Sequence, residues 1–166
     1  MAKLKQGFSL IEMVIYITIL VFMLVIVLQV VLSITRSQRV VRSVRDIEVS
    51  AYSLLERIER EVRGADSVRT ASSTLDVSSG HLTLDTTDTE GDARVVEIYL
   101  SNGVVRLRED GVESGALTQE SVRVTGLTFR RFSTSTVEGI RTEVALETGT
   151  STYYRAENFY SSALIR

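Results

Sequence analysis

An apolar stretch near the start of the chain is the feature that most limits how this protein can fold. Residues 13–28 contain no charged side chain, and Gln29 is the first clear polar interruption. Counted over residues 8–32, the stretch reaches the ~20 mostly apolar residues that a helix needs to cross a membrane. One carboxylate, Glu12, lies near its beginning. A charge inside a membrane costs roughly 2.5–3.5 kcal/mol near the centre, so we expect Glu12 to have a partner and a role.

The residues that open this stretch form a motif. A short basic leader ends in Gly7 and is followed by Phe8, a small hydroxyl residue, two aliphatic residues and Glu12. This pattern resembles the N-terminal signal of type IV pilins and type II secretion pseudopilins. Gln6 departs from the family, which more often has Lys or Arg before the glycine, although two lysines keep the leader basic.

The resemblance implies a processing pathway. Residues 1–7 would be a leader peptide that a prepilin peptidase removes by cleavage after Gly7, and the new N-terminal residue, Phe8, would be N-methylated. The further partners that it implies are membrane lipid before assembly, an inner-membrane assembly platform and other pilin or pseudopilin subunits. The protein would then be a single-pass cytoplasmic (inner) membrane protein with an exported C-terminal domain, and part of a pilus or pseudopilus after assembly.

Glu12 and Phe8 are spaced four residues apart and share one face of a helix. A carboxylate and an N-terminal ammonium would each be costly alone in lipid. Pairing Glu12 with the Phe8 amine of a neighbouring subunit would satisfy both groups and would set the axial register of a filament. The alternative is that the Glu12 side chain extends to the lipid headgroups and serves no assembly role.

The charges that flank the span conflict with the expected orientation. Two lysines precede it and four arginines follow it, at positions 36, 39, 42 and 45. By count alone, the positive-inside rule places the arginine side in the cytoplasm. The resemblance implies the opposite, with the C-terminal part exported, and we follow the motif because it is the more specific signal.

Beyond the span, residues 33–64 are predicted to continue the same helix in amphipathic form. Aliphatic residues recur at spacings of three, four or seven, and the charged residues opposite them include the pairs Glu56–Arg60 and Glu59–Arg63 at i, i+4. Residues 65–166 are rich in Thr, Ser, Val, Gly and aromatics, with several period-two stretches. Asn102-Gly103 is a strong hairpin signal, and Asp110-Gly111 marks another turn.

The predicted fold class is therefore α+β. A long N-terminal helix, transmembrane in its first half and amphipathic in its second, would pack on a one-sided antiparallel sheet in the head, as in type IV pilins. Strands are expected at 81–84, 94–100, 104–108, 122–124, 127–132 and 141–146, with the last strand or two in 153–165. Residues 54–65, 126–132 and 162–166 are also similar to segments of J-type minor pseudopilins and related minor pilins, which are tip or initiator subunits.

The residue types argue against an enzyme and leave two binding hypotheses. With one histidine and no cysteine, neither a Cys–His dyad nor a multi-histidine metal site can form within the chain. His81 is expected to be exposed and not catalytic. No cofactor is expected, apart from a weak candidate calcium site of oxygen ligands close in sequence. Its residues are Asp85, Asp88, Glu90 and Asp92.

DNA binding is the second hypothesis, and we consider DNA an unlikely partner. Its candidate residues are basic and aromatic positions of neighbouring predicted strands: Arg123, Arg130, Arg131, Arg141, Phe129 and Phe132. We therefore interpret the chain as a structural subunit, and more narrowly as a minor one, of a type IV pilus or type II secretion pseudopilus. The alternative is a signal-anchored membrane protein whose β-rich head binds a ligand or DNA and is never assembled.

Overall fold

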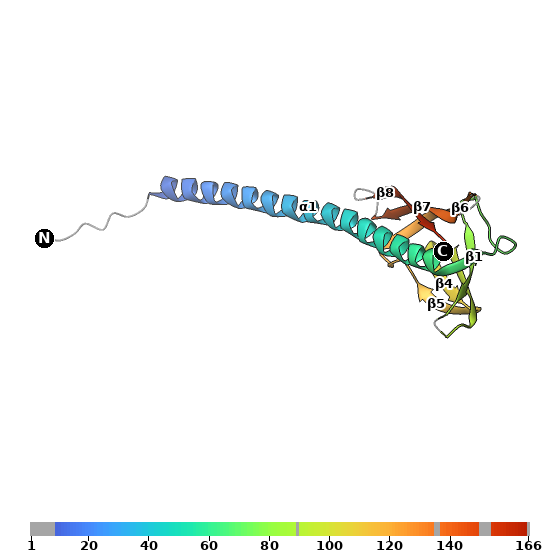
Figure 1. The fold of residues 1–166 in the computed structure, drawn as a ribbon. Coiled ribbons are helices and arrows are strands. Elements are labelled where there is room, and N and C mark those ends of the chain that lie inside the picture. Colours follow the sequence, from blue (N-terminus) through green and yellow to red (C-terminus); the bar gives the residue numbers. More distant parts are fainter. Residues whose placement is uncertain (1–8, 89, 135–136, 150–153, 166) are drawn as a thin grey trace. The chain divides into compact units, whose positions relative to one another are not determined.

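The structure is a computed structural model that describes residues 9–88, 90–134, 137–149 and 154–165, without the side chains at 36, 39 and 40. In these ranges one helix, α1 (Leu10–Gly64), is followed by eight strands (Figure 1). The chain divides into two compact units, Met1–Val41 and Arg42–Arg166. The helix followed by antiparallel strands confirms the predicted α+β class.

In the first unit, α1 carries the apolar stretch. The segment Leu10–Thr35 is 26 residues long with a mean hydropathy of 3.0, which is long and apolar enough to cross a membrane. None of it is buried within the chain. Its two threonine hydroxyls, on Thr18 and Thr35, donate to the carbonyl oxygens four residues earlier, at 2.8 and 2.9 Å. The two threonines therefore satisfy their own hydroxyls within the helix, and the segment presents aliphatic side chains outward.

In the second unit, the last turns of α1 supply one wall of the hydrophobic core. The most deeply buried apolar positions follow a helical repeat, because each comes three or four positions after the last. They are Ile47, Ala51, Leu54, Ile58 and Val62, each at most 1% exposed, and Leu55 beside them is 7% exposed. On the solvent side, the predicted pairs Glu56–Arg60 and Glu59–Arg63 form, at 3.3 and 2.5 Å.

The strands form two antiparallel sheets, where the sequence predicted one. The first sheet has the order β1 (Ala65–Val68), β2 (His81–Thr87), β3 (Ala93–Ser101), β4 (Val104–Glu109) and β5 (Val112–Ala116). The second has the order β6 (Val122–Ser133), β7 (Glu138–Thr148) and β8 (Arg155–Leu164). Loop residues cover the free edge of β6: the Leu127 carbonyl accepts the amides of Ser79 and Gly80. That edge is therefore not available for a ladder to the first sheet.

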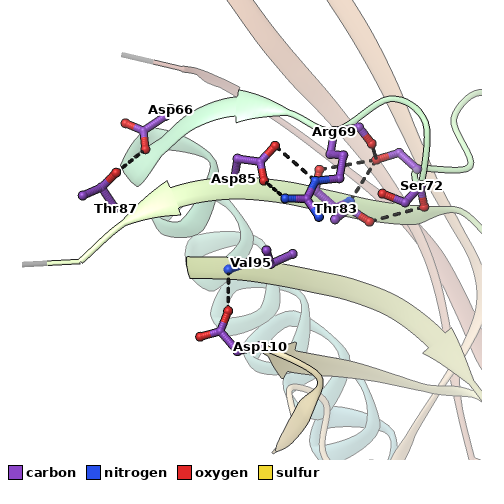
Figure 2. Close-up of polar contacts among 9 residues, drawn as sticks. Asp66, Arg69, Ser72, Thr83, Asp85, Thr87, Val95 and Asp110 are labelled. Carbon is purple, nitrogen blue, oxygen red and sulfur yellow. Dashed lines mark hydrogen bonds and ion pairs between the residues drawn. The ribbon is translucent and has the colours of Figure 1, made fainter. Parts of the chain in front are cut away.

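Both predicted turns are two-residue hairpin turns. Asn102 and Gly103 have φ angles of 52° and 78°, and Asp110 and Gly111 have φ angles of 48° and 80°. Positive φ at both central positions matches the right-handed twist of the flanking strands. The Asp110 carboxylate also accepts the backbone N–H of Val95, at 2.8 Å (Figure 2).

The segments 122–124 and 127–132 were predicted as separate strands, and the structure joins them in β6. A β-bulge lies between Val124 and Gly126 in the ladder with β7. The extra residue changes which side chains face inward, so the buried residues switch from Val122 and Val124 to Leu127 and Phe129. The break in alternation that suggested two strands is therefore the bulge itself.

Candidate functional site

The candidate functional site is the N-terminal end of α1. Gly7 and Phe8, the expected cleavage and methylation residues, lie outside the described residues. The Ser9 carbonyl accepts the backbone N–H groups of Glu12 and Met13, at 3.1 and 3.2 Å. These bonds place Glu12 in the first turn of the helix, where a negative charge is favoured by the partial positive charge of the helix N-terminus.

Glu12 has a hydrogen-bond donor that the sequence reasoning missed. The Tyr16 hydroxyl donates to Glu12 Oε1 at 3.0 Å. Side chains four positions apart lie on the same helix face, so this spacing was the signal that could have revealed the contact. A tyrosine in an apolar run is easily read as one more membrane-facing residue.

The structure does not gather the four acidic residues of the proposed calcium site. Asp85 forms an ion pair with Arg69, and the Asp66 carboxylate accepts the Thr87 hydroxyl at 2.7 Å (Figure 2). Among the described residues, no three carboxylate or histidine side chains are grouped so that they could hold one metal ion. Calcium binding therefore stays a prediction from the sequence.

Asp88 has a local role in the turn between β2 and β3. Its Oδ1 accepts the backbone N–H groups of Glu90 and Asp92, at 2.8 and 3.0 Å. The bond from Asp92, followed by the bond from Glu90, lowers the pKa of the Asp88 carboxyl below its ordinary value because both bonds favour the charged form. The carboxylate therefore closes this turn.

The arginines considered for DNA binding are all paired with carboxylates of β7. Arg130 Nε lies 3.1 Å from Glu143 Oε1, and Arg131 Nε lies 2.5 Å from Glu138 Oε1. The hydrogen bond to Glu143 is the main reason that the pKa of Arg130 is raised. Arg141 and Arg123 have partners too, Glu143 at 3.4 Å and Glu147 at 3.8 Å. This face has little uncompensated positive charge for a phosphate backbone.

The aromatic residues of the same hypothesis do not form a stacking platform. Phe129 is fully buried in the core, and Phe132 is 40% exposed. His81, which the sequence placed at the surface, is half-buried in β2. Its ring packs edge-on against Tyr99, with 5.7 Å between ring centroids. The ring contact explains the burial, since β2 and β3 place these two residues directly opposite each other.

Comparison with known proteins gives one finding, and it falls on the N-terminal site. Residues 2–28 match the family model described as the prokaryotic N-terminal methylation motif. No curated protein and no solved structure matches the chain. The match spans the basic leader, Glu12 and most of the apolar stretch of α1. The chain therefore carries the N-terminal signature of type IV pilins and pseudopilins.

Proposed function

We propose that the protein is a structural subunit, with a minor or initiator role, of a type IV pilus or type II secretion pseudopilus. One observation carries this proposal. The methylation motif at residues 2–28 coincides with a helical segment, Leu10–Thr35, that is apolar and unburied within the chain. If this apolar segment belonged to a soluble protein, its side chains would be buried in a hydrophobic core. Here none of them is buried in the described part of the chain.

The exposed apolar surface favours both anchoring in the membrane and packing in a filament. Large side chains of the segment, such as Phe22 and Leu20, are 70% and 64% exposed. Lipid covers them while the subunit is anchored in the membrane. In a filament the same surface would pack against the helices of other subunits, where dispersion contacts replace those with lipid. One segment thus serves as the anchor and as the assembly surface.

Glu12 is assigned the register role in this proposal. After cleavage, a neighbouring subunit would contribute the Phe8 amine, and the pair would satisfy a carboxylate that lies inside the apolar segment. We expect Glu12→Ala to be cleaved normally and to enter filaments poorly. Assembly of Glu12→Ala at the wild-type level would refute the register role. It would leave the proposed cleavage of the leader unaffected.

The processing step is tested by intact-mass measurement of the full chain from a host with a prepilin peptidase. We expect the wild-type mass to correspond to a chain that starts at N-methylated Phe8. Gly7→Ala should retain the leader, since the added methyl group hinders access of the peptidase to the backbone. Gly64→Ala is the matched control, because a Cβ there has nothing within 4 Å and the site is remote from the motif.

A retained leader in the wild-type chain, in a host that processes a control pilin, would refute the proposal. The protein would then be a membrane-anchored protein that is not assembled. Protease protection of the head in intact cells tests the second part, the export of the C-terminal domain. Degradation only after opening of the inner membrane would place the head in the cytoplasm, as the arginines after the span predict by count.

The J-type assignment is a finer proposal that rests on sequence similarity alone. Its three segments lie at the end of α1, in β6 and at the end of β8. We expect a minor subunit of this kind to co-purify with a few tip partners and to be sparse in sheared filaments. An abundance equal to that of the main filament subunit would contradict the minor role.

A further inference from the structure

Tyr16 covers the only charged group of the apolar segment. Between Ser9 and Thr35, Glu12 is the single described residue that is partly buried, and all others with a described side chain are exposed. Side chains in a helix point back toward its N-terminus, so a residue at i+4 lies over the residue at i. The Tyr16 hydroxyl donates to Glu12 Oε1 at 3.0 Å, so Tyr16 contributes to this shielding.

The hydrogen bond of Tyr16 differs from those of the two threonines in the segment. The hydroxyls of Thr18 and Thr35 donate to backbone carbonyls of their own helix, and such a local bond satisfies a hydroxyl in lipid. The phenol of Tyr16 instead donates to a carboxylate, and a hydrogen bond to a charged group is stronger than one between neutral groups. A phenylalanine would be easier to place in lipid but could not make this bond.

We propose that Tyr16 is a positioning residue, which holds the Glu12 carboxylate against the helix at the depth where a neighbouring subunit's amine meets it. Without the bond, the flexible side chain of Glu12 would extend to the headgroups. A carboxylate offers about four lone-pair sites, so the bond from Tyr16 leaves acceptor capacity for an ammonium group. This inference rests on the proposed function, and it adds a second residue to the register pair.

The test compares how strongly chains that start at Phe8, with anchor and head intact, associate with one another in lipid vesicles. The sequence has no cysteine, so Val112→Cys, at a strand position that is 72% exposed, gives a single labelling site for fluorescence energy transfer. We expect Tyr16→Phe to raise the apparent dissociation constant between about threefold and about eighteenfold, the range that follows from measured hydrogen bonds within membranes. Tyr52→Phe is the control, because Tyr52 lies on the same helix and contacts Phe159 through its ring.

A second comparison separates positioning from a general effect on the membrane anchor. In chains that also carry Glu12→Ala, Tyr16→Phe should change the dissociation constant no further, because the group it positions is absent. An equal loss in both backgrounds, or no loss in the wild-type background, would overturn the role of Tyr16. The mass of each chain is measured first: a retained leader overturns the proposed function and this inference with it, whereas a processed chain with unchanged association overturns the inference alone.

Discussion

Replacement of Ile58 tests whether the second part of α1 belongs to the hydrophobic core of the unit Arg42–Arg166. Its side chain is 1% exposed, and it is one of the buried positions of α1 that line the hydrophobic core. Replacement with alanine removes three carbon groups, which at ~0.8 kcal/mol per buried methylene accounts for about 2.4 kcal/mol. The cavity left behind adds to this loss, and the better helix propensity of alanine returns less than about 0.7 kcal/mol. We expect Ile58→Ala to lower the free energy of unfolding by about 2–5 kcal/mol.

The assay is urea denaturation of the full chain in detergent micelles, followed by the near-ultraviolet circular dichroism of its tyrosines. With a denaturant slope of ~1–3 kcal/mol per molar urea, a loss of about 3 kcal/mol moves the midpoint by about 1–3 M. Val49→Ala is the matched control on the same helix, since Val49 is 47% exposed, and its effect should stay within about 0.5 kcal/mol. An Ile58→Ala loss no larger than that of the control would refute the reasoning.

Three further predictions concern the head. Gly139→Ala should destabilise it by ~1–3 kcal/mol in the same assay, because a Cβ at Gly139 would lie 2.7 Å from the Ala163 backbone oxygen; a neutral effect would contradict the close packing of β7 on β8. Gly103→Ala should cost ~1–2 kcal/mol, since its φ of 78° suits glycine, and Gly111→Ala should cost about the same at φ 80°. The pKa of Asp88, measured by NMR titration, should lie below its ordinary value of 3.8, because amide donors favour the charged form of the carboxyl. A lowered pKa means that this stabilisation is present above the unfolded-state pKa and is lost as the pH falls through the folded-state pKa; titration at or above 3.8 would show that the turn does not form.

The features that the sequence predicted well are those that local rules determine. The helix follows from apolar periodicity without glycine or proline between Phe8 and Arg63, and its ion pairs follow from i, i+4 spacing. Asn102-Gly103 predicted its hairpin because few residues other than glycine and asparagine adopt positive φ readily. The methylation motif is likewise a short contiguous pattern, and the family model confirms it over residues 2–28.

The features that the sequence did not predict depend on contacts between distant segments. β5 has the sequence Val-Glu-Ser-Gly-Ala, with no alternation of apolar residues, so only its pairing with β4 shows that it is a strand. The division into two sheets depends on the loop residues that cover the free edge of β6. Asp85 suggested a metal ligand because its partner, Arg69, lies 16 positions away and reaches it only when β2 is in place.

The two units of the chain should respond differently to mutation. The core of Arg42–Arg166 is complete within that unit, since its buried residues come from the later turns of α1 and from both sheets. No residue of the segment Leu10–Thr35 is buried within the chain, so we expect its stability to depend on lipid or on other subunits. Changes at Glu12 and Tyr16 should therefore alter assembly and leave the urea midpoint of the head unchanged. Changes at Ile58 should lower that midpoint and leave the proposed cleavage after Gly7 intact, because that cleavage would involve only the leader. If Glu12→Ala shifted the midpoint of the head, the separation of anchor and head into independent units would be wrong.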